Sequence, residues 1–197
     1  MRTEIVAVIS SAILCLAAYG SGQQNQPPHH KEPTPEQQAF REELKLHSAH
    51  LQQLHAQAKQ IFDAEMAGEK ADDCPVAGST YEMKVCYGKQ IDVTEANLKS
   101  FEAIIRNSLA PGPQIPGEPA APPPGPAGPS LTPGQKQAEL DKVELAWRQY
   151  RESVCAAAFH QYDGGTLGPI VEDQCYLRIT RNHMRDLSTV YEFGLGH

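Results

Sequence analysis

The 25 residues from Ala110 to Gly134 include ten prolines and five glycines, and they constrain the fold more than any other feature of the chain. Proline removes a backbone N–H donor and glycine increases the entropy lost on ordering, so neither a helix nor a strand is expected here. We expect residues 110–134 to form an extended Pro/Gly-rich linker. A ligand for proline-reading domains is the alternative, but a linker needs no partner and is favoured. The folded core must therefore come from both sides of this segment.

The first 22 residues have the pattern of a secretory signal peptide. Arg2 precedes an apolar stretch of 14 residues from Ile5 to Ala18, and small residues suited to signal peptidase come next. The sequence has no run of 18 or more apolar residues, which argues against a membrane-spanning helix. We expect export with removal of residues 1–22, and then a disordered leader over the polar, proline-containing residues 23–33.

A long amphipathic helix is predicted over residues 34–70. Thr34, Pro35 and Gln37 offer an N-cap, a first-turn proline and a capping-box partner. A stripe then recurs at alternating spacings of four and three residues, which is a heptad pattern. The members of the stripe are Phe40, Leu44, His47, Leu51, Leu54, Ala58 and Ile61. This stripe either packs against the rest of the chain or forms a homodimer through residues 40–61, and three heptads support the dimer only weakly.

Three further helices are predicted. One runs from about Thr80 to Ser108, a second from near Thr132 to Tyr162–Gly165, and the last from Glu172 to Glu192, after a loop that Pro169 keeps irregular. The expected inward face of the second comprises Leu140, Val143, Trp147, Tyr150, Val154 and Ala157. That of the last comprises Tyr176, Ile179, His183, Leu187 and Val190. No segment of the sequence shows sustained strand alternation, so the predicted fold class is all-α, a three- to four-helix bundle interrupted by the linker.

Four cysteines remain once the signal peptide is removed. They are Cys74, Cys86, Cys155 and Cys175. An even number in an exported chain predicts two disulfides, whereas the spacing does not match a zinc site. Four cysteines allow three connectivities, and sequence alone does not choose among them. The helical hairpin expected around Gly164 and Gly165 favours Cys155–Cys175, because these lie nine and ten residues from the two glycines. Cys74–Cys86 then remains.

Charge and polar residues point to few chemical functions. The chain has 17 Lys and Arg against 24 Asp and Glu, and its net charge of −7 argues against a nucleic-acid binder. His160, Asp163 and His183 are better explained as a polar helix end and a core histidine than as an acid–base set. His47 and His50 share a helical face, but no further ligands complete a metal site. We expect no catalytic residues, no metal and no other cofactor.

An aromatic–arginine cluster lies on the helix that comes after the linker. Trp147 and Tyr150 are expected to share a face, with Arg151 within reach on the same turn. We favour a core aromatic pair with an arginine at its polar edge, because Trp147 is the only tryptophan of a small bundle. The alternative is a binding hot spot, since Trp, Tyr and Arg dominate such sites.

Short motifs succeed one another along the chain in a distinctive order. They are Thr80-x-Glu82-Met83-x-x-Cys86, Trp147-x-x-Tyr150-Arg151-x-x-x-Cys155, Gly164-Gly165, Cys175 and Thr180. In these motifs the chain resembles the lysozyme-inhibitor LprI-like domain family, over residues 72–109 and 135–192. The chain departs from the family in three places: the linker looks inserted, the helix 34–70 lies outside the resemblance, and Lys99 stands where members commonly have Asn.

The resemblance implies a small bacterial domain exported to the periplasm or cell envelope, without enzymatic activity. For the namesake branch it implies lysozyme inhibition, so the implied partner is a basic protein such as lysozyme. An acidic chain is compatible with such a partner, because opposite charge raises the association rate. We therefore expect a binding protein that inhibits lysozyme by occlusion. The alternative is a structural or assembly protein of the envelope that oligomerises through its heptad helix.

Overall fold

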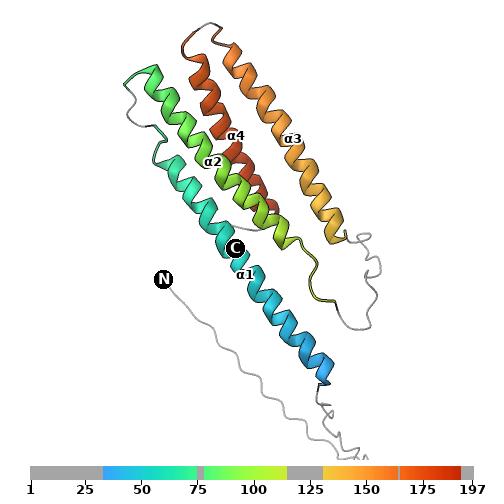
Figure 1. The fold of residues 1–197 in the computed structure, drawn as a ribbon. Coiled ribbons are helices and arrows are strands. Elements are labelled where there is room, and N and C mark those ends of the chain that lie inside the picture. The colour runs from blue at the N-terminus through green and yellow to red at the C-terminus, as the bar shows by residue number, and fades with distance from the viewer. Residues whose placement is uncertain (1–32, 75–77, 115–130, 164, 192–197) are drawn as a thin grey trace, which may run out of the picture. The chain divides into compact units, whose positions relative to one another are not determined.

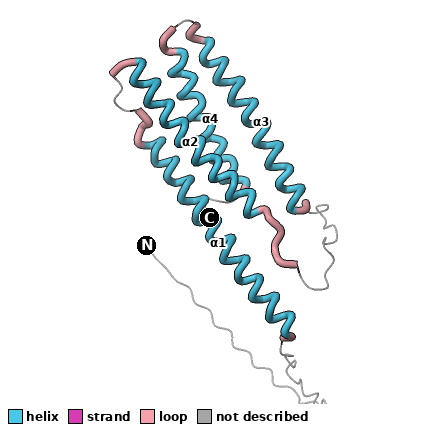
Figure 2. Tube along the Cα trace, viewed as in Figure 1, coloured by secondary structure: helices cyan, strands magenta, loops and turns pink. Residues whose placement is uncertain are grey.

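Four helices make up the computed structural model, which describes residues 33–74, 78–114, 131–163 and 165–191. The helices are α1 (Pro35–Lys70), α2 (Thr80–Ser108), α3 (Pro133–His160) and α4 (Gly168–Val190), drawn in Figure 1. Figure 2 shows helices joined by loops, and no strand occurs within the described ranges. The predicted all-α bundle is confirmed. The expected signal peptide, nearly all of the leader and linker residues 115–130 lie outside the described residues.

Two helices start with capping boxes that the sequence predicts. In α1 the hydroxyl of Thr34 accepts from the Gln37 backbone N–H at 3.3 Å, and the Gln37 side chain accepts from the Thr34 N–H at 3.0 Å. Thr132 and Gln135 make the same pair of contacts at the start of α3, at 3.3 and 2.8 Å. Each box satisfies two N–H groups that a helix start leaves without partners. The helix predicted to begin near Thr132 begins at Pro133, so residues 133 and 134 of the expected linker lie in the first turn of α3.

The last helix begins earlier than the sequence predicts. It starts at Gly168, four residues before the expected Glu172, and Pro169 lies in its first turn. The first-turn N–H groups of a helix have no carbonyl to bind, so a proline loses nothing there. The expectation that Pro169 keeps this loop irregular was therefore wrong.

The centre of the bundle is α4, which packs against α3, α2 and, less extensively, α1. It buries 12 of its 23 residues, whereas α1 buries three of 36. The main core includes Phe101 and Ile105 of α2, Leu140 of α3, and Met184 and Leu187 of α4. Since α2 and α3 pack on the same central helix more than on each other, a groove lies between them.

The face that α3 buries differs from the predicted one. Val143 and Tyr150 are 47% and 59% exposed, whereas Glu144 is buried beside Leu140 and Trp147. The reason is that α3 packs closely against α4 alone, so only a narrow strip of it is covered. The predicted inward face of α4 holds in its middle but fails at its end, where Val190 is 69% exposed.

The first helix packs on the bundle through its C-terminal half. Leu54 and Ala58 are 5% and 0% exposed and belong to the same core as α2 and α4. In the N-terminal half Leu44 and Leu46 are 41% and 73% exposed, and this end reaches beyond α2 in Figure 1. The C-terminal part of the predicted heptad stripe is therefore already buried against other helices of the same chain.

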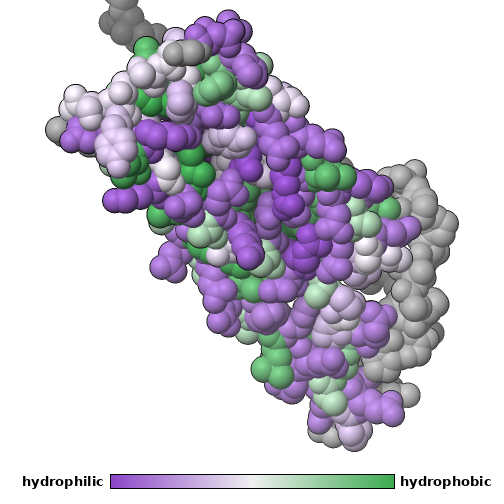
Figure 3. Space-filling view, turned by 45° about the horizontal axis from the view of Figure 1, so that its top comes forward, coloured by the Kyte–Doolittle hydropathy of each residue, from purple (hydrophilic) through white to green (hydrophobic). Residues whose placement is uncertain are grey.

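The surface is largely hydrophilic on the side drawn in Figure 3, with small apolar patches between polar side chains. None of the helices in the described residues has the length and apolar character needed to cross a membrane.

Candidate functional site

Two disulfides fasten the bundle at the points where chain segments meet. Cys155 of α3 is joined to Cys175 of α4, with 5.4 Å between their Cα atoms, and both residues are buried. Cys74 in the loop after α1 is joined to Cys86 of α2, with 6.1 Å between their Cα atoms. These are the pairings that the helix layout favours. Each closes a short loop, which stabilises the fold by about 3 kcal/mol on a chain-entropy argument.

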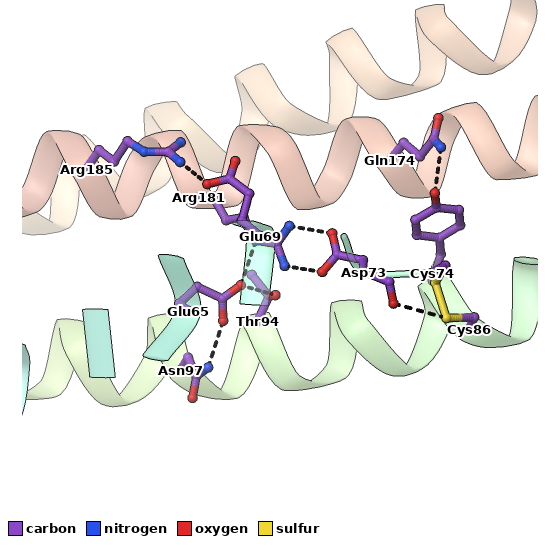
Figure 4. Close-up of polar contacts among 11 residues, drawn as sticks. Glu65, Glu69, Asp73, Cys74, Cys86, Thr94, Asn97, Gln174, Arg181 and Arg185 are labelled. Carbon is purple, nitrogen blue, oxygen red and sulfur yellow. Dashed lines mark hydrogen bonds and ion pairs between the residues drawn. A yellow bond between two sulfur atoms is a disulfide. The ribbon is translucent and has the colours of Figure 1, made fainter. Parts of the chain in front are cut away.

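A buried arginine organises the contact between α1, α2 and α4 (Figure 4). Arg181 of α4 donates from Nε to Glu65 of α1 at 2.7 Å, and from its two terminal nitrogens to both oxygens of Asp73 at 2.5 and 2.6 Å. Thr94 and Asn97 of α2 donate to Glu65, each at 2.7 Å. Both carboxylates are thus supplied with donors. The network holds α1 and the loop beside the first disulfide onto the central helix, which is a structural role.

The predicted Trp–Arg cluster forms a stack across α3 and α4. The rings of Trp147 and His183 are nearly parallel, with centroids 4.2 Å apart. The guanidinium of Arg151 lies 4.4 Å from the Trp147 centroid, as a cation–π contact, and donates to Thr180 at 2.9 Å and to Glu95. Burial, with smaller contributions from Arg151 and a neighbouring arginine, lowers the pKa of His183 to about 4. His183 is therefore neutral at pH 7.

Other members of the predicted cluster lie apart from this stack. Tyr150 is exposed and lines a small groove of about 330 Å³ between α3 and α4, together with Trp147, Arg178 and Asp186. Gly165 lies in the turn between α3 and α4, where its N–H donates to the carbonyl of Tyr162 at 2.7 Å. Gly164 lies outside the described residues. The structure thus brings Trp147 and Arg151 together, and Tyr150 points to solvent instead of the core.

The larger groove, of about 600 Å³, runs between α2 and α3 on the other side of Trp147. Three acidic and three basic residues line it, together with uncharged ones. The charged residues are Glu95, Lys99, Glu102 and Arg106 of α2, and Glu144 and Arg148 of α3. A groove of this size is within the range of binding sites for small molecules.

Two carboxyl groups of this groove are unusually buried. Glu102 and Glu144 are only 9% and 7% exposed. A terminal nitrogen of Arg148 lies 3.8 Å from Glu102 and 3.7 Å from Glu144, and Arg106 lies 3.5 Å from Glu144. These distances exceed the 2.7–2.9 Å of strong charge-assisted hydrogen bonds. Burial, then the charge of Glu144, raises the pKa of Glu102 to about 7, so this carboxyl carries a proton about half of the time near neutrality.

No three His, Cys, Asp or Glu side chains gather as metal ligands in the described part of the chain. Two grooves flank Trp147, one between α2 and α3 and the other between α3 and α4. Sequence reasoning found Trp147 and Arg151 but missed Glu102, Glu144 and Arg181. For Glu144 the sequence did contain a signal, because a residue three positions before Trp147 lies on the same face of the helix.

The structure is a disulfide-bonded helical bundle with charged side chains beside the only tryptophan of the sequence. The family model described as Lysozyme inhibitor LprI matches residues 71–187, and the chain belongs to that family. The match spans α2, both disulfides and α4 up to Leu187, and it begins just after α1. Comparison with curated proteins and with solved structures gives no match.

Several of the motif residues that carry the family resemblance have structural roles in this fold. Ser79 caps the N-terminus of α2, because its hydroxyl accepts a hydrogen bond from the backbone N–H of Glu82 at 3.2 Å. Arg151 and Thr180 join α3 to α4 through a hydrogen bond of 2.9 Å. The four cysteines form the disulfides. These motif residues thus stabilise the scaffold, and the grooves are candidate binding surfaces.

Proposed function

We propose that this protein is an exported, non-enzymatic binding protein of the bacterial cell envelope that inhibits lysozyme by occluding its substrate cleft. The observation that carries the proposal is the match to the lysozyme-inhibitor family over residues 71–187, the part of the chain that contains both disulfides. Disulfides form in oxidising compartments, which supports export. The net charge of −7 complements a basic lysozyme and favours fast association.

The arrangement of Glu102 and Glu144 supports binding over catalysis. A carboxyl of raised pKa beside a second carboxylate is also how glycosidases arrange their acid and nucleophile. Here one oxygen of each group is sealed from solvent, and the Arg148 guanidinium lies close to both. A substrate and a partner's basic side chain would both have to displace this arginine, but only the basic side chain would replace its positive charge beside the two carboxyl groups.

Inhibition kinetics test the proposal. The purified, oxidised protein is added to a basic animal lysozyme, and hydrolysis of a soluble chito-oligosaccharide is recorded at low and at high salt. Occlusion predicts a raised KM with an unchanged kcat, because substrate and inhibitor compete for one cleft. Added salt should weaken inhibition by screening the opposite charges. Unchanged hydrolysis at a micromolar excess of protein, at both salt concentrations, would exclude lysozyme inhibition.

An assembly role through α1 is the second candidate. The exposed Leu44 and Leu46 in the N-terminal half of α1 favour it. The burial of Leu54 and Ala58 within one chain counts against a dimer through the whole of residues 40–61. Sedimentation separates the candidates, since a concentration-independent monomer removes the assembly role.

A further inference from the structure

The buried carboxyl pair of the α2–α3 groove has fewer donors than it can bind. One oxygen of Glu102 and one of Glu144 are sealed from solvent and have no hydrogen-bond donor among the described residues. Their other oxygens lie 3.8 and 3.7 Å from Arg148, and that of Glu144 also accepts a long hydrogen bond of 3.5 Å from Arg106. A buried carboxylate without donors is costly, so an additional donor at this position would be strongly favourable.

The neighbouring cations supply no donor to the two sealed oxygens. Arg106 makes its short contact, of 2.7 Å, with Asp141, and its contact with Glu144 is a 3.5 Å hydrogen bond to the oxygen that is not sealed. Arg151 is paired with Glu95. Arg148 remains, and its side chain is 53% exposed and shared between the two carboxyl groups, so little holds it in position.

We propose that this groove receives one basic side chain, an arginine or a lysine, from the partner protein, which binds Glu102 and Glu144 after Arg148 moves aside. A guanidinium suits the site best, because its five N–H donors in a planar fork can serve two carboxylates at once. The inference rests on the proposed function, since it specifies how the acidic chain engages a basic lysozyme. It also makes this groove a part of the interface.

Proton linkage gives the proposal a distinctive signature. The groups that face Glu102 are Glu95 and Arg106 on its own helix and Glu144 and Arg148 on α3. On the side of α4, Tyr191 lies near Glu144. The pKa of Glu102 is about 7 before binding, and an added cation lowers it. Binding at pH 7 should therefore release a fraction of a proton, and the release should disappear at pH 9, where Glu102 is already ionised.

Calorimetric titration of a basic animal lysozyme into the oxidised protein tests the inference. The double variant Glu102→Gln plus Glu144→Gln keeps the shape of the pair and removes its charge. The control, Asp92→Asn plus Glu152→Gln, neutralises the same number of carboxyl groups at exposed positions of α2 and α3. We expect about ten- to hundredfold weaker binding for the groove variant, and less than about threefold for the control. Equal weakening in both, or no proton release from the wild-type protein at pH 7 in two buffers, would overturn the proposal.

A titration with a small cation distinguishes failure of this inference from failure of the proposed function. If no lysozyme complex forms, Nα-acetyl-arginine amide is titrated while the fluorescence of Trp147, the only tryptophan, is recorded. Its neutral isostere, Nα-acetyl-citrulline amide, is the control ligand. A saturable change that only the arginine derivative causes, and that the double variant loses, keeps the groove as a site for basic side chains without lysozyme as partner. No difference between the two ligands would overturn the proposal.

Discussion

Replacing Arg181 with methionine should destabilise the protein more than any other single change to a surface or buried ion pair. Methionine fills much of the same volume, so the loss is mainly electrostatic. Three hydrogen bonds to Glu65 and Asp73 disappear. Glu65, only 4% exposed, is left buried without its cation. Breaking one side of a buried ion pair costs about 3–5 kcal/mol. Since Thr94 and Asn97 still donate to Glu65, we expect about 3 kcal/mol.

The matched control lies one turn further along α4. Arg185 also pairs with a glutamate of α1, Glu69, but its side chain is 40% exposed. Arg185→Met should therefore cost less than about 1 kcal/mol, as solvent-exposed pairs do. The assay is urea unfolding of the oxidised protein monitored by circular dichroism, with the dependence on urea compared between variants to establish that the same surface unfolds.

A double variant identifies the origin of the loss. Arg181→Met leaves the Glu65 carboxylate buried without its cation, and adding Glu65→Gln removes that carboxylate. The double variant should therefore lose less unfolding free energy than the sum of the losses of Arg181→Met and Glu65→Gln measured separately. Equal losses for Arg181→Met and Arg185→Met, or strictly additive losses in the double variant, would refute the buried network as a main support of the α1–α4 contact.

Three further predictions concern stability. Burial raises the pKa of Glu102 from its ordinary 4.5 to about 7. The stability that protonated Glu102 contributes to the fold is therefore lost as pH rises from 4.5 to 7. Glu102→Gln should therefore be more stable than the wild type at pH 8, by at most about 3 kcal/mol in urea unfolding, and no more stable at pH 4. Burial lowers the pKa of His183 from 6.5 to about 4. The stability that neutral His183 contributes to the fold is therefore fully present above pH 6.5 and is lost as pH falls toward 4. His183→Phe, which keeps the ring stack on Trp147, should remove this loss from the urea midpoint measured between pH 6.5 and 4, and a wild-type-like loss would contradict it. Leu54→Ala should cost about 2–4 kcal/mol independently of protein concentration, whereas a concentration-dependent midpoint would indicate a dimer.

Local sequence signals predicted the helices well because the structures that they specify are local. The capping boxes at Thr34 and Thr132 depend on a partner three residues away, and both are present. The predicted bounds of α2, from Thr80 to Ser108, are those of the structure. Pro169 was misread because a proline after a turn marks either an irregular loop or a first helical turn. The residues C-terminal to the proline decide between the two, since they either continue a helix or do not.

The buried polar groups could not be predicted in the same way. Arg181 binds Asp73 and Glu65 across sequence separations of 108 and 116 residues. Nothing in the residues adjacent to Arg181 specifies those partners. The buried position of Glu144 also depends on tertiary context, because α3 presents only a narrow strip to α4, and Tyr150 falls outside that strip.

The most direct test of inhibition by occlusion is a competition titration. Binding of the oxidised protein to a basic animal lysozyme is measured with and without an oligosaccharide of N-acetylglucosamine held in the lysozyme cleft. At ten times the oligosaccharide's own Kd, occlusion predicts an apparent Kd for the protein about tenfold higher. An unchanged Kd would place the protein away from the cleft, and a lack of any complex without oligosaccharide would contradict the inhibitor function itself.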